Sequence, residues 1–291
     1  MTTYSTDSDP ASISPTVLIL GGFLTSPPMY RRLVERLRDR GAAGAVVAGV
    51  WLPDWLLAGV RGTGPLTTRS AKALVEAVRL SARVSGGAPL LVVGHSAGGM
   101  TARLLTAPEP FPGRRFGAAR HIGAIVSLGT PHRLSHGQGI GRRMNEMAAS
   151  VADRLVPGAF FAPEIGYVAV ASRAIRGDPH GSGIQRFSYL MYRSVIGRAA
   201  VPGTEGDGLV PVVAAALSGA RSLILDDACH SPGSGAPWYG SETAVDRWWP
   251  VALDAWRAAL AYRAGHVEFD GKGVHAYTAR AGWSSGSSSG S

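Results

Sequence analysis

The chain has 291 residues, of which 45% are apolar and 17% are charged, so it can bury a substantial core and general disorder is excluded. The net charge is +9, and Lys72 and Lys272 are the only lysines, so arginine carries nearly all of the positive charge. The arginines are scattered, without a long basic run or interleaved aromatic residues, and we expect no nucleic-acid partner. A surface association with anionic lipid or polymer stays open.

The single cysteine, Cys229, excludes a disulfide framework and a thiolate metal site. Residues 1–15 are polar, lack the basic start and apolar centre of a signal peptide, and are expected to be a disordered lead-in. No stretch approaches the roughly 18 apolar residues that a membrane span requires. We therefore expect a cytoplasmic protein, although a secreted enzyme whose signal peptide had been removed would give the same pattern.

Six apolar runs predict the strands of the core. Helical signals lie between them, so strand and helix alternate along the chain. Strands that are apolar throughout are typical of a parallel sheet covered on both faces, and we expect an α/β fold with a mostly parallel sheet and helices on both sides. The expected strands are Thr16–Leu20, Ala45–Val50, Leu90–Val93, one within His121–Leu128, Tyr167–Ala171 and Ser222–Leu225.

Two segments between the expected strands lack the regular apolar spacing of a helix or a strand. The stretch Trp51–Pro65 contains proline and glycine and is expected to be a long loop, followed by a helix to about Val84 with Leu74, Val75 and Val78 inward. The stretch Ser172–Glu205 is also expected to be irregular, although Phe187–Val195 could be ordered.

The C-terminal part combines a final helical region with a tail. Ser241 is expected to cap the helical region, which Pro250 must kink or divide into two helices. We expect one domain over residues 16–263, with cap-like insertions within 131–205, and a C-terminal tail over 264–291 that ends in a Ser/Gly-rich run.

The most informative stretch is the apolar run Leu90–Val93 followed by Gly94-His95-Ser96-Ala97-Gly98 and a helix-like segment. A serine between a buried strand and a helix lies on a tight turn, and the flanking glycines let the backbone approach closely there. This pattern predicts a nucleophile elbow that exposes the Ser96 hydroxyl, with the Ala97 N–H as one donor of an oxyanion hole.

A serine nucleophile needs a base, and the base needs an acid. His230 follows the last expected strand by five residues, on a Gly/Pro-rich loop, and is the expected base. Asp207 precedes it by 23 residues, between Gly206 and Gly208, and is the expected acid, with Asp178 as the alternative. The order Ser96, Asp207, His230 is that of hydrolases with such an elbow.

The remaining chemically active side chains have weaker contexts. His95 is expected to pack inside the fold, His132 to be structural, and Cys229 to be a small buried residue rather than a nucleophile. His132 and His136 have the spacing of metal ligands, but no neighbouring glutamate completes a zinc-protease pattern, and we expect no metal and no cofactor.

Four blocks resemble those of the α/β-hydrolase superfamily, and within it the serine lipases and esterases. They are Gly94–Gly99, Leu128–His132, Gly206–Pro211 and His230, in that order, and the resemblance covers roughly residues 16–262. It implies that the second oxyanion donor is the N–H of Phe23 or, because Gly21-Gly22 stands where many relatives have His-Gly, of Leu24.

These observations predict a serine hydrolase that cleaves carboxylic esters of small molecules or lipids through an acyl-enzyme on Ser96. A thioesterase or acyltransferase with the same triad is the alternative, and a non-catalytic binding protein on the same fold is another. Two long segments that separate core strands, Pro131–Gly166 and Ser172–Glu205, carry apolar residues, and we expect them to form a cap over Ser96. The expected substrate-binding residues are Phe160 and Phe187 of these segments, and Trp238 of the turn after His230.

Overall fold

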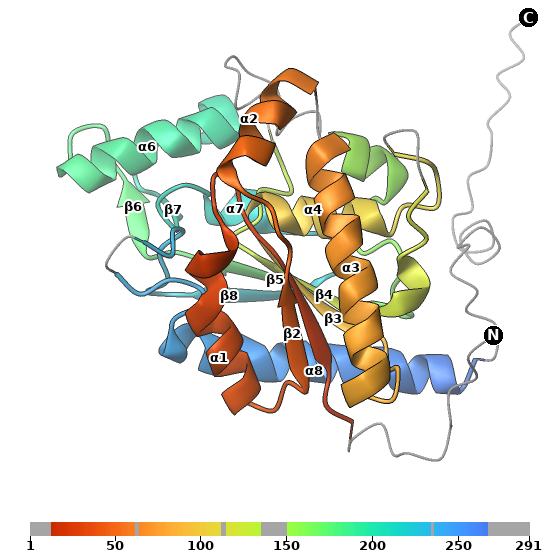
Figure 1. The fold of residues 1–291 in the computed structure, drawn as a ribbon. Coiled ribbons are helices and arrows are strands. Elements are labelled where there is room, and N and C mark those ends of the chain that lie inside the picture. The colour runs from red at the N-terminus through yellow and green to blue at the C-terminus, as the bar shows by residue number, and fades with distance from the viewer. Residues whose placement is uncertain (1–12, 62–63, 112–114, 135–149, 234–235, 267–291) are drawn as a thin grey trace, which may run out of the picture.

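The computed structural model describes residues 13–61, 64–111, 115–134, 150–233 and 236–266 (Figure 1). Its centre is a six-stranded sheet with the order β2-β1-β3-β4-β5-β8, in which every neighbouring pair is parallel. The mostly parallel sheet expected from the sequence is confirmed. The strands are β1 (Thr16–Leu20), β2 (Gly44–Val47), β3 (Leu90–His95), β4 (Ile122–Leu128), β5 (Gly166–Ser172) and β8 (Arg221–Leu225).

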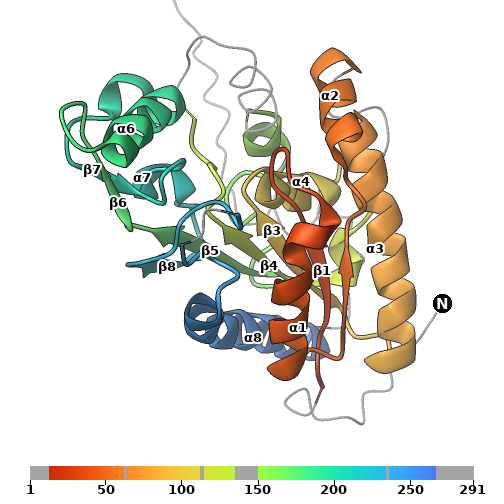
Figure 2. The same ribbon diagram turned by 60° about the vertical axis from the view of Figure 1, so that its left-hand side comes forward.

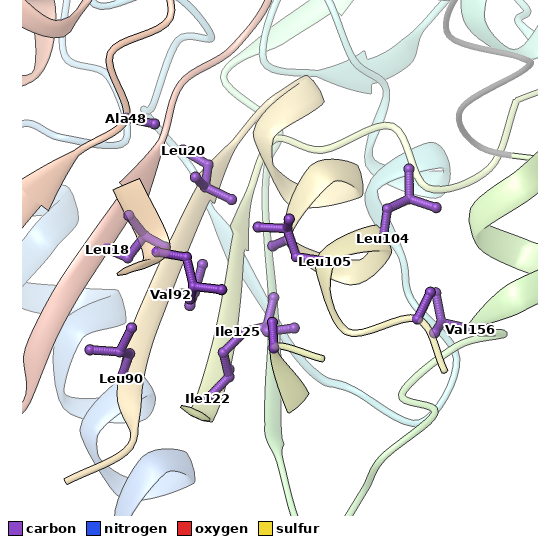
Figure 3. Packing of buried hydrophobic residues seen from close by; sticks show 14 of the residues in the cluster. Leu18, Leu20, Ala48, Leu90, Val92, Leu104, Leu105, Ile122, Ile125 and Val156 are labelled. Atoms are coloured by element: carbon purple, nitrogen blue, oxygen red, sulfur yellow. The ribbon is translucent and has the colours of Figure 1, made fainter. Parts of the chain in front are cut away.

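Helices cover both faces of this sheet (Figures 1 and 2). Because side chains alternate along a strand, β1 sends Leu18 and Leu20 to one face and Val17 and Ile19 to the other. The first face packs against α2 (Leu52–Arg61), α3 (Gly64–Val84) and α4 (Ala97–Leu105), and the second against α1 (Arg31–Asp39) and α8 (Glu242–Ala264). Figure 3 shows the first face, where side chains of β1, β3 and β4 lie opposite Leu104 and Leu105 of α4.

A smaller unit lies beside the carboxyl end of β5. It contains an antiparallel pair, β6 (Ile175–Gly177) and β7 (Thr204–Gly206), and the helices α6 (Gly183–Ile196) and α7 (Val212–Ala215). Their apolar residues form a separate cluster around the fully buried Tyr192. Figure 2 shows this unit and α2 on opposite sides above the end of the sheet. The short 3-10 helices are η1 (Pro27–Tyr30), η2 (Ala119–His121) and η3 (Gly197–Ala199).

Two predictions about the N-terminal half are wrong. Residues 52–61 form α2 rather than a loop, because Pro53 falls in the first turn, where its missing N–H costs nothing. The Asp54 carboxylate also accepts the N–H of Trp51 at 2.9 Å, which satisfies a donor at the helix start. In α3, Leu74 is buried as expected, but Val75 is 50% exposed.

The C-terminal half is more regular than expected. Order in Ser172–Glu205 extends beyond Phe187–Val195, and α6 begins with a capping box in which Ser182 and Gln185 exchange side-chain and main-chain hydrogen bonds. The final helix runs through Pro250 as one element, so Pro250 does not divide it into two helices. A polar, Gly-rich segment also predicts a helix near Arg142–Leu155; of this range only residues 150–155 are described, and they are helical. Most of the expected tail, residues 267–291, lies outside the described residues. Within the described part of the chain, no helix is long and apolar enough to cross a membrane.

Candidate active site

Ser96 stands between β3 and α4 in a backbone conformation that side chains rarely adopt, with φ 53° and ψ −124°. The turn is tight because Gly98 lies against the end of β1, where a Cβ would collide with the carbonyl of Leu20. The N–H of Ser96 donates to the carbonyl of Leu128 at 2.9 Å, which holds the turn to β4. The strained turn presents a half-buried serine at the carboxyl edge of the sheet.

His230 and Asp207 meet at the same edge, although they come from different parts of the chain. Nδ1 of His230 lies 2.8 Å from Oδ2 of Asp207, and the His230 N–H donates to the Asp207 carbonyl at 2.9 Å. Because a carboxylate can only accept, Nδ1 carries the proton of a neutral imidazole and Nε2 is left as an acceptor. This is the tautomer that a general base for a serine needs.

The Asp207 carboxylate is 1% exposed and accepts four hydrogen bonds. Its Oδ1 accepts the N–H groups of Leu209 at 3.0 Å and Val210 at 2.7 Å. Its Oδ2 accepts the Tyr239 hydroxyl at 2.9 Å in addition to His230. Burial acts to raise the pKa of Asp207, but the charge interaction and hydrogen bond with His230, together with the N–H groups of Val210 and Leu209, outweigh it, so the pKa lies below its ordinary value.

Asp178, the alternative acid, lies elsewhere. Its side chain accepts the N–H of His180 at 2.8 Å, and its main chain bonds to Gln185 and Gly181 in the turn before α6. Asp178 therefore shapes a turn, whereas Asp207 contacts His230.

The loop after β1 lies directly against the elbow. A Cβ on Gly22 would lie 2.8 Å from Cβ of Ser96, so only glycine allows this approach. Phe23 follows, and Leu24 has φ 57°. Among the described residues, the N–H groups of Phe23 and Leu24 have no hydrogen-bond partner, and the N–H of Ala97, at the first position of α4, has none within that helix. Both positions named for the oxyanion hole thus offer free donors beside Ser96.

Three other residues singled out in the sequence have defined surroundings. His132 is buried, with Nε2 2.9 Å from Oγ of Ser127 and Nδ1 3.3 Å from a guanidinium nitrogen of the buried Arg103. Burial and the Arg103 charge lower the pKa of His132 to about 3. Cys229 is half-buried rather than fully buried as expected. His136 lies outside the described residues, among which no group of metal-binding side chains is found.

The three expected substrate-binding residues have different environments. Phe187 lies on α6 and is 47% exposed, whereas Phe160 is half-buried and packs edge-on against Phe161. Trp238 is only 7% exposed, with its ring against those of Tyr30 and His95. The structure therefore places the apolar surface of Trp238 in the core rather than on an exposed turn after His230.

Sequence reasoning missed Tyr239 and Gly129. Tyr239 is fully buried and donates to Asp207, and its own carbonyl accepts the indole N–H of Trp248 at 2.8 Å. Gly129 has φ 56°, and a Cβ there would lie 2.6 Å from Oδ2 of Asp207. The positive φ and close approach explain the glycine of the Leu128–His132 block. Nothing in the residues around Tyr239 indicates its contact with Asp207, which lies 32 residues away in the sequence.

No family model and no curated protein matches the sequence. In three dimensions the chain is similar to a thermophilic esterase of Thermogutta terrifontis, at 17% identity and a TM-score of 0.44, over 90% of this chain and 88% of that one. It is also similar to Est1E of Butyrivibrio proteoclasticus bound to ferulic acid, at 11% identity and a TM-score of 0.40, over 91% and 94% of the two chains. A predicted CIB-like hydrolase of Thermoplasma acidophilum aligns at 14% identity and a TM-score of 0.35, over 87% and 88%. At these values the likeness assigns neither a reaction nor a substrate to this chain.

Proposed function

We propose that the chain is a serine hydrolase that cleaves carboxylic esters, with Ser96 as nucleophile, His230 as base and Asp207 as acid. The contact between His230 and Asp207 carries this proposal, because it leaves Nε2 of His230 able to take a proton. Four donors offset the cost of burying the Asp207 carboxylate and hold it where it fixes one orientation of the His230 imidazole. The strained elbow at Ser96 supplies the matching nucleophile.

In the proposed reaction, Oγ of Ser96 attacks the ester carbonyl while its proton moves to Nε2 of His230. The oxygen that becomes negative accepts the N–H groups of Ala97 and Phe23, the latter beside Leu24 in the same loop. The tetrahedral intermediate collapses as the C–O bond breaks, and the alcohol leaves with the proton from His230. Water, activated by His230, then attacks the acyl-enzyme, releases the acid and restores Ser96.

We further propose that α2 and α6 border the entrance and favour apolar acyl groups. Large apolar side chains stay exposed on both helices and on the loop after β1, and such groups are typical of binding surfaces. Phe23 also packs edge-on against Trp55 of α2, at 5.3 Å between ring centroids, which ties the loop to that helix. The exposed side chains are Phe23, Leu24, Trp51, Leu52, Leu56, Leu57, Ile184, Phe187 and Leu190.

The experiment is a panel of nitrophenyl esters from C2 to C16, beside a triglyceride emulsion and the matching acyl thioesters. Hydrolysis of the esters, with kcat/KM rising toward longer chains, is expected. Turnover of thioesters alone would favour the thioesterase alternative. No turnover of any substrate, together with no reaction with a fluorophosphonate, would favour the alternative that the chain is a non-catalytic binding protein on this fold.

A further inference from the structure

His95 joins the two loops that complete the site. Its side chain is 1% exposed, and it is the residue before Ser96. Nε2 of His95 lies 2.9 Å from the main-chain oxygen of His230, and Nδ1 lies 2.8 Å from the hydroxyl of Tyr30. The Tyr30 hydroxyl in turn accepts the N–H of Gly22 at 2.9 Å, in the loop after β1. One imidazole therefore contacts the loop of the expected base and, through Tyr30, the loop of the expected oxyanion hole.

The chemistry of these groups fixes the direction of each hydrogen bond. A carbonyl only accepts, so Nε2 of His95 carries the proton and Nδ1 is an acceptor. The Tyr30 hydroxyl lies 2.8 Å from Nδ1 of His95 and 3.1 Å from Oγ1 of Thr25. Its single proton is directed along the shorter contact, to Nδ1, which has no proton of its own, while the Tyr30 oxygen receives the Gly22 N–H. Thr25 donates its own proton to the Gly22 carbonyl at 2.7 Å, which closes the loop on its other side. Every polar atom of His95 and Tyr30 thus has a specified role.

Burial keeps this arrangement in one protonation state. Burial and the nearby His230 lower the pKa of His95 to about 3, and burial raises the pKa of Tyr30 to about 12. The rings of Trp238, Tyr239 and His230 enclose His95, with the His230 ring centroid 5.0 Å away. A neutral, enclosed imidazole cannot take a second orientation without losing both hydrogen bonds.

We propose that His95 is a positioning residue that sets the distance between the loop of His230 and the oxyanion-hole loop, by a hydrogen bond to the His230 carbonyl and one to Tyr30. The proposal rests on the proposed function for its catalytic consequence. Ser96 is the residue after His95, so the positions of the nucleophile, the base loop and the oxyanion-hole loop all depend on the His95 side chain. A displacement of about 1 Å between such groups can lower turnover by about 10²-fold.

Four variants separate the two hydrogen bonds. In His95→Gln the amide nitrogen reaches the position of Nε2 and retains the donor to His230. In His95→Asn the amide oxygen lies near the position of Nδ1, so the contact with Tyr30 is retained and the donor to His230 is lost. His95→Phe removes both, and Tyr30→Phe removes only the hydroxyl. His132→Phe is the matched control, because His132 is equally buried but contacts Arg103 and Ser127 instead.

The measurement is kcat and KM per active site titrated with a fluorophosphonate, together with the melting temperature. His95→Asn and His95→Phe are expected to lower kcat by roughly 10- to 100-fold with KM changed little, whereas His95→Gln stays within about threefold of the parent. Tyr30→Phe is expected to lower kcat by roughly tenfold. His132→Phe is expected to lower the melting temperature with kcat per site unchanged. If the His95 variants behave like this control, the positioning role is overturned.

A second readout does not depend on turnover. The proton of His230 Nδ1 that bridges to Asp207 gives a downfield proton resonance, and its position reports the geometry of that pair. It is expected to shift in His95→Asn and His95→Phe and to return to the parental position in His95→Gln. An unchanged resonance in all three would overturn the positioning role even if the parent hydrolysed no ester. A parent that neither turns over esters nor reacts with the fluorophosphonate would instead overturn the proposed function.

Discussion

Asp207 and His230 are joined twice, by side chains and by main chains. The carboxylate accepts Nδ1 of His230 at 2.8 Å, and the Asp207 carbonyl accepts the His230 N–H at 2.9 Å. The main-chain hydrogen bond fixes the loop of His230 against the loop of Asp207. The two side chains are therefore already placed at hydrogen-bonding distance. The pair is further enclosed by Tyr239, whose hydroxyl donates to the same carboxylate oxygen.

Asp207→Asn is expected to lower kcat by on the order of 10⁴-fold, because an amide nitrogen facing Nδ1 favours the wrong imidazole tautomer. The measurement is kcat on a short nitrophenyl ester, with the melting temperature as a check on folding. Asp178→Asn is the matched control and should leave kcat close to that of the parent. A large loss in Asp178→Asn with none in Asp207→Asn would assign the acid to the turn before α6.

Ser96→Ala is expected to abolish ester hydrolysis, with a loss of about 10⁴-fold or more and an unchanged fold. Ser194→Ala, on the exposed face of α6, is the control. Steady-state rates and circular dichroism check both. Residual activity of Ser96→Ala within tenfold of the parent would contradict its role as nucleophile.

Gly22→Ala is expected to lower kcat by roughly 10²-fold, since the new methyl group would lie 2.8 Å from Cβ of Ser96 and 3.0 Å from Nδ1 of His95 and must displace the loop. Gly49→Ala is the control, because a Cβ there meets nothing within 4 Å. The comparison of kcat and KM for the two variants tests the close approach. Equal activity of both variants would show that the loop after β1 tolerates displacement.

Phe187→Ala is expected to lower kcat/KM for long acyl esters more than for short ones, without a change in melting temperature, because this side chain is exposed on α6. Phe160→Ala should act in the same direction on chain-length preference but also lower the melting temperature, because Phe160 is half-buried against Phe161 and the core. Val75→Ala is a control of similar exposure on α3 and should change neither property. Trp238→Ala is expected to destabilise the fold by about 3–5 kcal/mol, as for other buried tryptophans. Unchanged chain-length preference in both phenylalanine variants would argue against a cap.

Acidification is expected to destabilise the fold partly through His132. The pKa of His132 is about 3 in the folded chain and near 6.5 when unfolded, so the unfolded chain binds more protons between these values. Stability is therefore fully present above pH 6.5 and is lost as pH falls toward 3, by up to about 1.4 kcal/mol per pH unit for this group. His132→Gln, followed by urea unfolding from pH 7 to 4, should show a shallower loss than the parent. The exposed His180→Gln should follow the parent, and equal slopes in all three would exclude His132 as a source.

The elements that local pattern determines could be predicted from the sequence. The elbow at Ser96 could be predicted because an apolar run ends in the closely spaced glycines Gly94 and Gly98. Asp207 and His230 could be predicted from the glycines and prolines that flank them and from the order of the three residues along the chain. The helix α2 could not be predicted from the sequence. Proline breaks a helix except in its first turn, and the sequence does not show whether Pro53 belongs to a loop or to the first turn of a helix. The contacts of His95 and Tyr239 could not either, since their partners lie far away in sequence.

The most direct test that Ser96 is the nucleophile is labelling with a fluorophosphonate, followed by mass spectrometry of the digested chain. We expect one adduct per chain, on the peptide that contains Ser96, absent in Ser96→Ala and much slower to form in His230→Ala. An adduct on another serine, or no adduct on a folded chain, would contradict it.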